Sequence, residues 1–552
     1  MAGQNGNPSP VSNGSLGWDD EVDVIVLGTG AAGLTAALAA AANGARVAVC
    51  EKAATVGGTT AVSGGIAWVP AHDRAPNIDL PVEDALQYLR AQALGSMDEA
   101  LVETYVRTAP HMLDFVEAHS ELKFRIADGF PDYKPELPGG KATGGRSLGP
   151  APYPLDRLGA WGDRITSFPP DFSNVGFDAE TRARLDAAAN AEEGDVCVAG
   201  TALVAGLLKG LLDLGVEPRL QSRALELVAG PDGIVGVVLA EPSGERRLRA
   251  SRGVILATGG FEWDRDLVGD FLRGPMHGPV SPPANTGDGL RMAMAHGAAL
   301  GNMGEAWWVP VIKIPGDTFN GQPRARSVRL ERTRPRCIMV NRLGRRFVNE
   351  ACDYNSMGGA FHYLDPREGY VNDPAWMVFD AQHLKRYGFL SVEPGGQAPN
   401  WFFRGETVEE LATASGIDPA GLSTTVENWN KSVARGYDPE FGRGQSAYDG
   451  WWGDDKADTL AGRTLGPLDE GPYYAVPMTI GAMGTKGGPR VDRDGLVQHV
   501  SGGSVRGLYA AGNAMAGATG KAYGGAGGTI GPAMTWGFRA GHTAATGRSF
   551  QW

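Results

Sequence analysis

Near its start the chain carries an apolar strand, closely spaced glycines, an alanine-rich helix and a second strand, in that order. Residues 23–27 (DVIVL) predict a buried strand, and residues 28–33 (GTGAAG) follow at once. Residues 34–42 predict a helix, and residues 45–50 predict a strand that ends beside Glu51. Strand, GxGxxG, helix, strand and acid together indicate a Rossmann-type βαβ unit, which commits this part of the chain to a parallel sheet.

Each residue of this unit has a physical role in binding a dinucleotide. Gly28 allows the tight turn, Gly30 lets the backbone approach a pyrophosphate, and Gly33 lets the helix pack on the strand. The free N–H groups at the start of the helix face the phosphates, together with the helix dipole. Glu51 can accept hydrogen bonds from a ribose. The unit by itself leaves open whether the dinucleotide is FAD or NAD.

Three glycine-tipped strands, far apart in the sequence, favour FAD. A second glycine-rich stretch, residues 52–65, follows Glu51 directly and can run beside a flavin. Residues 254–260 (VILATGG) predict a buried strand that ends in glycines, and residues 507–513 (GLYAAGN) predict a strand that brings backbone near the ribityl chain. This arrangement resembles FAD-binding oxidoreductases. The FAD-binding domain must then be discontinuous, because its parts lie at both ends of the chain.

The segment after residue 507 is unusually rich in glycine. Nine glycines fall between Gly507 and Met534, and residues 533–545 predict a helix directly afterwards. Glycine at this density in a folded segment indicates backbone in close contact with something flat or charged. Tyr523 stands in the middle of this run, which makes it a candidate functional residue.

A chain of 552 residues is too long for one compact core, so we expect two or more domains. The predicted fold class is α/β: a discontinuous, Rossmann-like FAD-binding domain with an inserted catalytic domain that forms an α+β cap. We expect a disordered lead over 1–18, the FAD-binding domain over 19–300 and 476–552, and the catalytic domain over 301–475. Further predicted elements are helices at 82–94, 98–119, 200–214 and 290–296, and a hairpin at 225–239.

Charge and composition exclude several classes of partner. The formal net charge of −13 argues against a nucleic acid or an anionic membrane surface. The four cysteines lie far apart without a CxxC, which fits a reducing compartment. No histidine spacing is typical of a metal site, and no apolar run reaches transmembrane length. We therefore expect a cytoplasmic protein, or one peripheral to the membrane, with no metal and no integral membrane segment.

Several sequence blocks together carry a family resemblance. They are residues 57–65 (GGTTAVSGG) with 68–70 (WVP), 285–289 (NTGDG), 341–350 (NRLGRRFVNE), 484–488 (GTKGG) and the C-terminal glycine run. The chain resembles the flavoprotein family of succinate dehydrogenase and fumarate reductase, most closely its branch of 3-ketosteroid 1-dehydrogenases. Residues 481–488 lack the histidine that the fumarate reductases use to hold a dicarboxylate. Residues 59–61 (TTA) stand where succinate dehydrogenases attach flavin through a histidine, so we expect non-covalent FAD.

The resemblance implies roles for individual residues. Tyr523 and the N–H of Gly527 match the pair that binds the ketone oxygen, Tyr354 matches the base, and Tyr133 matches a helper tyrosine. The residues that it implies for FAD binding are Gly28, Gly30, Ala31, Ala32, Gly33, Glu51, Lys52, Gly58, Thr59, Thr60, Ser63, Gly64, Gly65, Ala257, Thr258, Gly259, Asn285, Asp288, Gly512, Asn513, Gly528, Thr529 and Ile530.

Some of these residues could have a purely structural role instead. Tyr133 and Tyr354 could be packing residues, and Ser63 could merely cap a turn. The aromatic residues at 307–308 and 401–403 could wall a substrate pocket, although core packing is the favoured interpretation. Gly524 and Ala526 stand where the branch commonly has prolines, which leaves room for a different ring system.

The expected reaction is FAD-dependent 1,2-desaturation of a 3-ketosteroid, in which a tyrosine takes the α proton and flavin N5 takes the β hydride. Two alternatives remain open: desaturation of a smaller cyclic ketone of the cyclohexanone type, and a flavin-dependent enone reductase. A non-catalytic flavoprotein is a weaker reading. The expected partners are a small-molecule ketone, taken to be a steroid, and an external electron acceptor such as a quinone.

Overall fold

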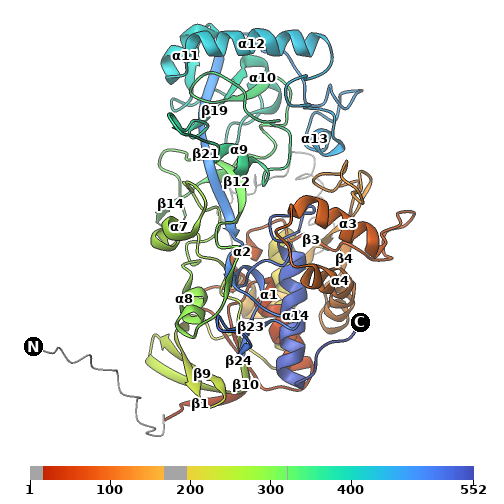
Figure 1. The fold of residues 1–552 in the computed structure, drawn as a ribbon, viewed down its shortest axis with the longest axis vertical. Helices are drawn as coiled ribbons and strands as arrows, with labels where there is room; N and C mark the ends of the chain where they lie inside the picture. Colours follow the sequence, from red (N-terminus) through yellow and green to blue (C-terminus); the bar gives the residue numbers. More distant parts are fainter. Residues whose placement is uncertain (1–16, 167–195, 320) are drawn as a thin grey trace, which may run out of the picture.

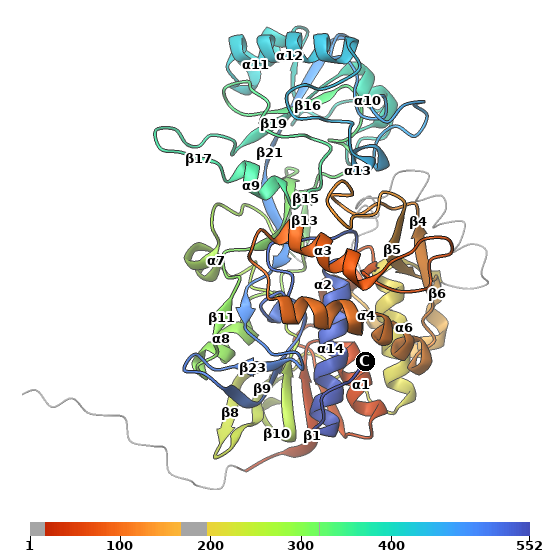
Figure 2. The same ribbon diagram turned by 45° about the vertical axis from the view of Figure 1, so that its right-hand side comes forward.

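The computed structural model describes residues 17–166, 196–319 and 321–552, so nearly all of the predicted disordered lead lies outside the described residues. Two bodies follow one another along the longest axis (Figure 1). One contains a parallel sheet with both chain termini, and the other contains an antiparallel sheet under helices α11 (Val408–Ser415) and α12 (Pro419–Ala434). The long strand β21 (Tyr473–Thr485) runs from the second body toward the first in both views (Figure 2).

The parallel sheet is assembled from both ends of the chain. Its order is β2-β1-β10-β24-β23, in which the first four strands are parallel. Leu27 pairs with both Cys50 and Leu256, and Leu256 pairs with Ala510, so these four strands end at the same edge. The strands are β1 (Asp20–Leu27), β2 (Val47–Cys50), β10 (Gly244–Leu256), β24 (Ser504–Ala510), β23 (Leu496–Gln498) and the added hairpin β8 (Arg223–Gly230) and β9 (Gly233–Glu241).

Helix α1 (Ala31–Ala42) and helix α14 (Ile530–Thr546), the first and last α-helices of the described chain, pack closely together. A Cβ atom on Gly537 would lie 2.3 Å from the carbonyl oxygen of Ala32, and one on Gly541 would lie 2.2 Å from that of Ala36. Glycine at these two positions therefore lets the helix backbones meet. Helices α3 (Val82–Ala93), α4 (Glu99–His119) and α6 (Ala199–Asp213) belong to the same body.

The antiparallel sheet has the order β15-β12-β21-β19-β16, with β20 beside β21. Its side chains alternate between two cores, as the period of a strand requires. On β16, Ile338 and Val340 join the core under α11 and α12, whereas Cys337 and Met339 join the core on the other face. The strands are β12 (Ala306–Ile312), β15 (Arg326–Ser327), β16 (Cys337–Val340), β19 (Ala375–Asp380) and β20 (Phe403–Gly405).

Shorter elements complete the described chain. The helices are α2 (Gly58–Ala61), α7 (Arg265–Phe271), α8 (Asp288–Ala295), α9 (Met357–Phe361), α10 (Ala381–Tyr387) and α13 (Ala447–Trp451), with 3-10 turns η1 (Leu155–Arg164) and η3 (Gly512–Ala514). The strands are β3 (Ala67–Trp68), β4 (Phe124–Asp128), β5 (Gly144–Pro150), β6 (Tyr153–Pro154), β7 (Val196–Cys197), β11 (Leu300–Gly301), β13 (Thr318–Phe319), β14 (Gln322–Pro323), β17 (Leu364–Asp365), β18 (Gly369–Tyr370) and β22 (Gly488–Pro489).

The predicted α/β fold class with a Rossmann-like parallel sheet is confirmed. The strand predicted from residue 254 begins ten residues earlier, at Gly244, because its first half pairs with the hairpin strand β9. The helix predicted over 533–545 begins at Ile530. The domain boundaries at 300 and 475 stay predictions.

Contact between α1 and α14 should be essential to the fold. We predict that Gly541→Val lowers the free energy of unfolding by about 1–3 kcal/mol or more, because its side chain must displace the backbone of α1. Thermal unfolding measures this. The control is Gly269→Ala on α7, where an added Cβ meets nothing within 4 Å, and a midpoint that falls equally in both variants would contradict the account.

Candidate active site

A cavity of about 780 Å³ opens at the edge where the four parallel strands end. Leu27, Cys50, Ala257 and Ala511 line it from the strand ends, and Tyr354, Trp451 and Trp452 line it from the second body. This volume is within the range of cofactor and small-molecule sites, roughly 300–1,000 Å³. Open α/β sheets bind their ligands at this edge.

The glycine-rich turn after β1 is shaped for close approach. Gly28 has a φ of +110°, and a Cβ there would lie 2.3 Å from the carbonyl oxygen of Ala257. Helix α1 begins beyond Gly30 without a side-chain cap, and the N–H of Ala31 donates to Thr60 Oγ1 over 3.0 Å. The start of the helix thus faces the cavity with N–H groups suited to a pyrophosphate.

Glu51 is buried at the tip of β2 and also lines the cavity. Its carboxylate accepts hydrogen bonds from the N–H and hydroxyl of Thr29 and from the N–H of Ala53. A carboxylate offers about four acceptor positions, so the predicted bond to a ribose hydroxyl remains available. Lys52 Nζ, the next residue along, bonds Asp288 over 3.0 Å and Thr286 over 2.7 Å.

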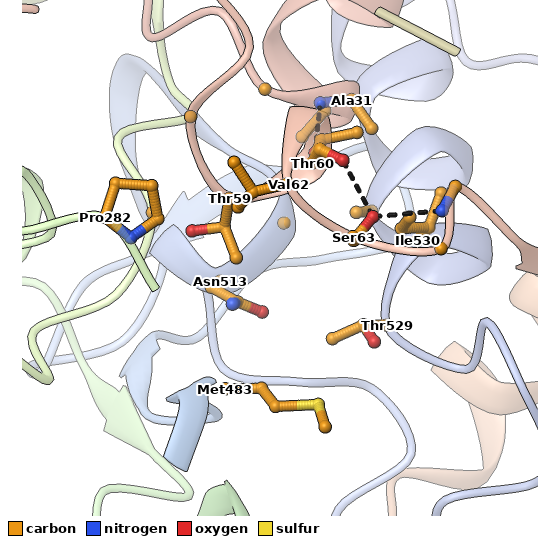
Figure 3. A pocket seen from close by; sticks show the side chains of 18 of the residues that line it. Ala31, Thr59, Thr60, Val62, Ser63, Pro282, Met483, Asn513, Thr529 and Ile530 are labelled. Atoms are coloured by element: carbon orange, nitrogen blue, oxygen red, sulfur yellow. Dashed lines mark hydrogen bonds between the residues drawn. The ribbon is translucent and has the colours of Figure 1, made fainter. Parts of the chain in front are cut away.

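The middle of the cavity is polar and tightly cross-linked. Asn285 donates to Thr59 over 2.9 Å and to the buried Glu262 over 2.7 Å. Ser63 donates to the carbonyl of Thr60 and accepts from the N–H of Gly65, so it caps a turn, which was the structural alternative for this residue. Ser63 also lines the cavity. Figure 3 shows Thr59, Thr60 and Ser63 with Asn513, Thr529 and Met483, which line the same cavity.

Nearly all residues predicted to bind the cofactor line this one cavity. They are Gly28, Gly30, Ala31, Ala32, Glu51, Lys52, Gly58, Thr59, Thr60, Ser63, Gly64, Gly65, Ala257, Thr258, Gly259, Asn285, Asp288, Gly512, Asn513, Thr529 and Ile530. Gly33 lies behind the wall, where a Cβ would meet the carbonyl of Gly28, and Gly528 lies under the ring of Tyr523. Thr258 Oγ1 is buried without a hydrogen-bond partner among the described residues and lies against Gly289, where a Cβ would come within 2.3 Å of it.

Four hydroxyl groups form a chain at the opposite end of the cavity. The Tyr133 and Tyr354 hydroxyl oxygens lie 2.7 Å apart, Tyr354 donates to Tyr523 over 3.0 Å, and the Tyr523 hydroxyl lies 3.2 Å from Thr529 Oγ1. Burial raises the pKa of each of the three phenols, and the neighbouring phenols raise that of Tyr133 further. The three predicted tyrosines therefore meet, although they come from three distant segments.

The glycine run around Tyr523 is held by its carbonyl groups. The Gly524 carbonyl accepts from the Tyr88 hydroxyl over 2.7 Å and from the Tyr133 N–H over 3.0 Å. The Gly527 carbonyl accepts from the N–H of Trp68. A Cβ on Gly524 would lie 2.5 Å from the Trp68 ring, so the run rests on that indole. Within the described chain the Gly527 N–H has no acceptor, and Gly527 lines the cavity.

Sequence reasoning missed Lys486 as a site residue. Its side chain is buried, and Nζ donates to the carbonyls of residues 520, 521 and 522 over 3.2–3.4 Å, directly before Tyr523. Nζ also lies 4.1 Å from the ring centre of Trp307, whose indole N–H donates to Asn513. Burial lowers the pKa of Lys486 to about 7. The GTKGG block that contains it was the available signal.

Aromatic residues wall the tyrosine end, but not those the sequence singled out. Trp308 and Phe402 pack in the core of the second sheet, whereas the buried Trp307 ring lies 4.7 Å from that of Tyr523 and supports it from behind the cavity wall. The lining comes instead from Phe130, Trp451 and Trp452. The Phe130 ring lies 4.9 Å from that of Trp451 and 5.4 Å from that of Trp452.

No group of three or more His, Cys, Asp or Glu side chains among the described residues is arranged to hold a metal ion. No helix in the described part of the chain is long and apolar enough to cross a membrane.

The fold and the cavity define a flavin-dependent oxidoreductase, and comparisons with known proteins agree. A family model described as FAD binding domain matches residues 23–530. A 4-oxocyclohexanecarboxylate 2-dehydrogenase of Sinomonas cyclohexanicum is 41% identical, over 95% of this chain and 92% of that protein. A 3-oxosteroid 1-dehydrogenase of Mycolicibacterium smegmatis is 35% identical, over 94% of this chain and 96% of that protein.

A solved structure gives the same result. The 3-ketosteroid delta1-dehydrogenase of Sterolibacterium denitrificans, in complex with 1,4-androstadiene-3,17-dione, superposes with a TM-score of 0.86 at 34% identity, over 96% of this chain and all of that one. The chain belongs to the FAD binding domain family, in the 3-ketosteroid 1-dehydrogenase branch that its sequence blocks predicted. FAD is its cofactor.

Lys486 should hold the Tyr523 loop in place. We predict that Lys486→Met keeps FAD but lowers the free energy of unfolding by about 1–3 kcal/mol, because buried carbonyls lose their donor. Urea unfolding and turnover with a ring ketone measure the effect. Lys521→Met, which changes a half-exposed lysine of the same loop, is the control. An unaltered unfolding midpoint and rate in Lys486→Met would refute this role.

Proposed function

We propose that this protein desaturates a ring ketone, removing a proton from the carbon beside the carbonyl and a hydride from the next carbon. The proposal is supported by one observation above all: three tyrosine hydroxyls and a Gly527 N–H with no acceptor among the described residues lie in one cavity, whose other end is lined by the glycine-rich turn after β1. FAD supplies the hydride acceptor at its N5 position. Side chains and backbone of the protein would bind the carbonyl oxygen and accept the α proton.

The carbonyl oxygen would be bound by Tyr523 and Gly527. As the α proton leaves, negative charge moves onto this oxygen, and two converging donors stabilise it. Losing one such donor typically lowers the rate by about two to three powers of ten. The Tyr523 hydroxyl is already fixed by Thr529 and Tyr354, and Gly527 is fixed through its carbonyl.

Tyr354 would take the α proton. Its phenol is a weak base, because burial raises its pKa further. The Tyr133 hydroxyl, 2.7 Å away, can donate to the phenolate as it forms and so stabilises it. Tyr133 is a positioning and stabilising residue in this scheme.

Two classes of ring ketone are candidates for the substrate. Relatives of the chain are named for a 3-oxosteroid and for 4-oxocyclohexanecarboxylate, and both compounds carry a ring carbonyl. Gly524 and Ala526 contribute small side chains or none beside Tyr523, which leaves the ring size open. An external electron acceptor of the quinone type would reoxidise the flavin, and a cytoplasmic or membrane-peripheral location would suit either substrate.

An anaerobic substrate screen tests the activity. Without oxygen, the flavin absorbance near 450 nm should bleach when a substrate ketone is added and should recover with an artificial acceptor, since two electrons enter the flavin. Androst-4-ene-3,17-dione and 4-oxocyclohexanecarboxylate are the first compounds to compare. If dithionite-reduced protein reduces enones and no saturated ketone bleaches the flavin, the protein is instead an enone reductase.

The tyrosines can be tested separately. Tyr354→Phe and Tyr523→Phe should retain FAD and the unfolding midpoint, yet lower kcat by about 10² or more, because each removes one hydroxyl from the reacting centre. Tyr448→Phe is a matched control, since its buried hydroxyl is not one of the four that form the chain of hydrogen bonds. Near-normal turnover in both test variants would reject the assigned roles.

The pH dependence follows from the raised pKa of Tyr354. Because burial favours the neutral phenol, the basic form is scarce near pH 7 and becomes more abundant as the pH rises. We therefore predict that kcat/KM increases from pH 7 toward pH 10, and that this increase disappears in Tyr354→Phe. A flat profile, or one that falls with pH, would contradict proton removal by this phenol.

A further inference from the structure

Arg329 lies in the cavity wall near the tyrosine end, just after β15. Its neighbours Val328 and Leu330 are buried, while Arg329 itself is part-buried and lines the cavity. Its Nε is buried and has no hydrogen-bond partner among the described residues. The same described part of the chain contains no ion pair to its guanidinium.

The positive charge of Arg329 acts on the pKa of two phenols, those of Tyr354 and Tyr523. Burial raises the pKa of Tyr354 and of Tyr523, and the Arg329 charge opposes that rise in both phenols. The side chains of Arg329, Tyr354 and Tyr523 all line the same cavity, so one ligand in it can contact all three. A second guanidinium, that of Arg463, also lines the cavity.

Nearby carboxylates do not hydrogen-bond the Arg329 guanidinium within the described residues. Glu331 accepts a hydrogen bond from the backbone N–H of Arg329, and the Arg329 charge opposes the rise that burial causes in the pKa of Glu331, but no hydrogen bond joins the two side chains. Asp128 and Asp455 line the cavity but are exposed to solvent. A part-buried guanidinium without a hydrogen-bonded carboxylate costs free energy that a bound anion can recover. Its planar fork matches a carboxylate, with two parallel N–H···O bonds.

We propose that Arg329 binds a carboxylate on the substrate, so that the preferred substrates are small ring ketones bearing an acid group away from the carbonyl. This inference rests on the proposed desaturase function and narrows its substrate class. Tyr523 and Gly527 bind one end of such a molecule through its carbonyl, and Arg329 binds the other end. A neutral steroid dione would bury this guanidinium without a counter-ion.

Paired substrates test the proposal on the FAD-loaded protein. 4-Oxocyclohexanecarboxylate and its methyl ester share the reacting ring and differ in charge. Wild type should favour the acid, and Arg329→Met should lower kcat/KM for the acid about 10- to 100-fold, mainly through KM, because a hydrogen-bonded charge pair is lost. The ester should be almost unaffected. Arg329→Lys should restore part of the preference, and Arg435→Met, at an exposed position on the second body, should change nothing.

Binding without turnover separates this inference from the function on which it rests. Cyclohexanecarboxylate has no ketone, and calorimetry should show its Kd rising about 10- to 100-fold in Arg329→Met. Equal losses for acid and ester, or an unchanged Kd, would overturn the carboxylate site while leaving the desaturase intact. An Arg329-dependent Kd without flavin bleaching by any ring ketone would support the anion site and overturn the desaturase. FAD content and the unfolding midpoint of each variant show that it is folded.

Discussion

Hydrogen bonds to backbone carbonyls anchor the loop that carries Tyr523, and the buried Tyr523 ring packs against Trp307, Tyr133 and Tyr354. The run from Gly520 to Gly528 has so little side chain that hydrogen bonds must hold it, and they come from several directions. Lys486 and Tyr88 donate to its carbonyls, Trp68 N–H binds that of Gly527, and the Trp68 ring supports the run from beneath. A Cβ in the centre of this run would collide with the indole. The absence of side chains is therefore what permits the anchoring.

This anchoring places the tyrosine hydroxyls and the glycine turn that faces the cofactor in one cavity. The run leads directly into α14, which packs on α1, and α1 begins at the glycine turn that faces the cofactor. The hydroxyl of Tyr523 meets Tyr354 from the second body and Tyr133 from the loop between β4 and β5. One cavity thus has a phosphate-binding end fixed by helices and a hydroxyl end fixed by hydrogen bonds. A rigid spacing between the two ends suits chemistry in which a proton and a hydride leave neighbouring carbons.

The sequence predicted best what is encoded locally. The βαβ unit is contiguous, so its turn, helix and acid could be recognised from residues 23–51, and Tyr523 stood out because its neighbours are glycines. The GTKGG block marked the segment around Lys486 but not the role of that lysine, and nothing in the sequence marked Arg329. Both roles arise from tertiary contacts: Lys486 binds the carbonyls before Tyr523, and Arg329 lines the cavity with an Nε that has no hydrogen-bond partner among the described residues. Tyr133 was predicted from the family resemblance, but its contact with Tyr354 could not be. That contact depends on the loop that carries Tyr133, whose backbone N–H donates to the Gly524 carbonyl.

The proposed desaturation requires that Tyr523 and Gly527 bind the same carbonyl oxygen. A crystal structure of the FAD-loaded protein with a slowly reacting ring ketone tests this most directly. It should show the ketone oxygen about 2.6–3.2 Å from both the Tyr523 hydroxyl and the Gly527 N–H, with the α carbon facing Tyr354. A ketone whose oxygen points away from both groups, with its α carbon remote from every tyrosine hydroxyl, would contradict it.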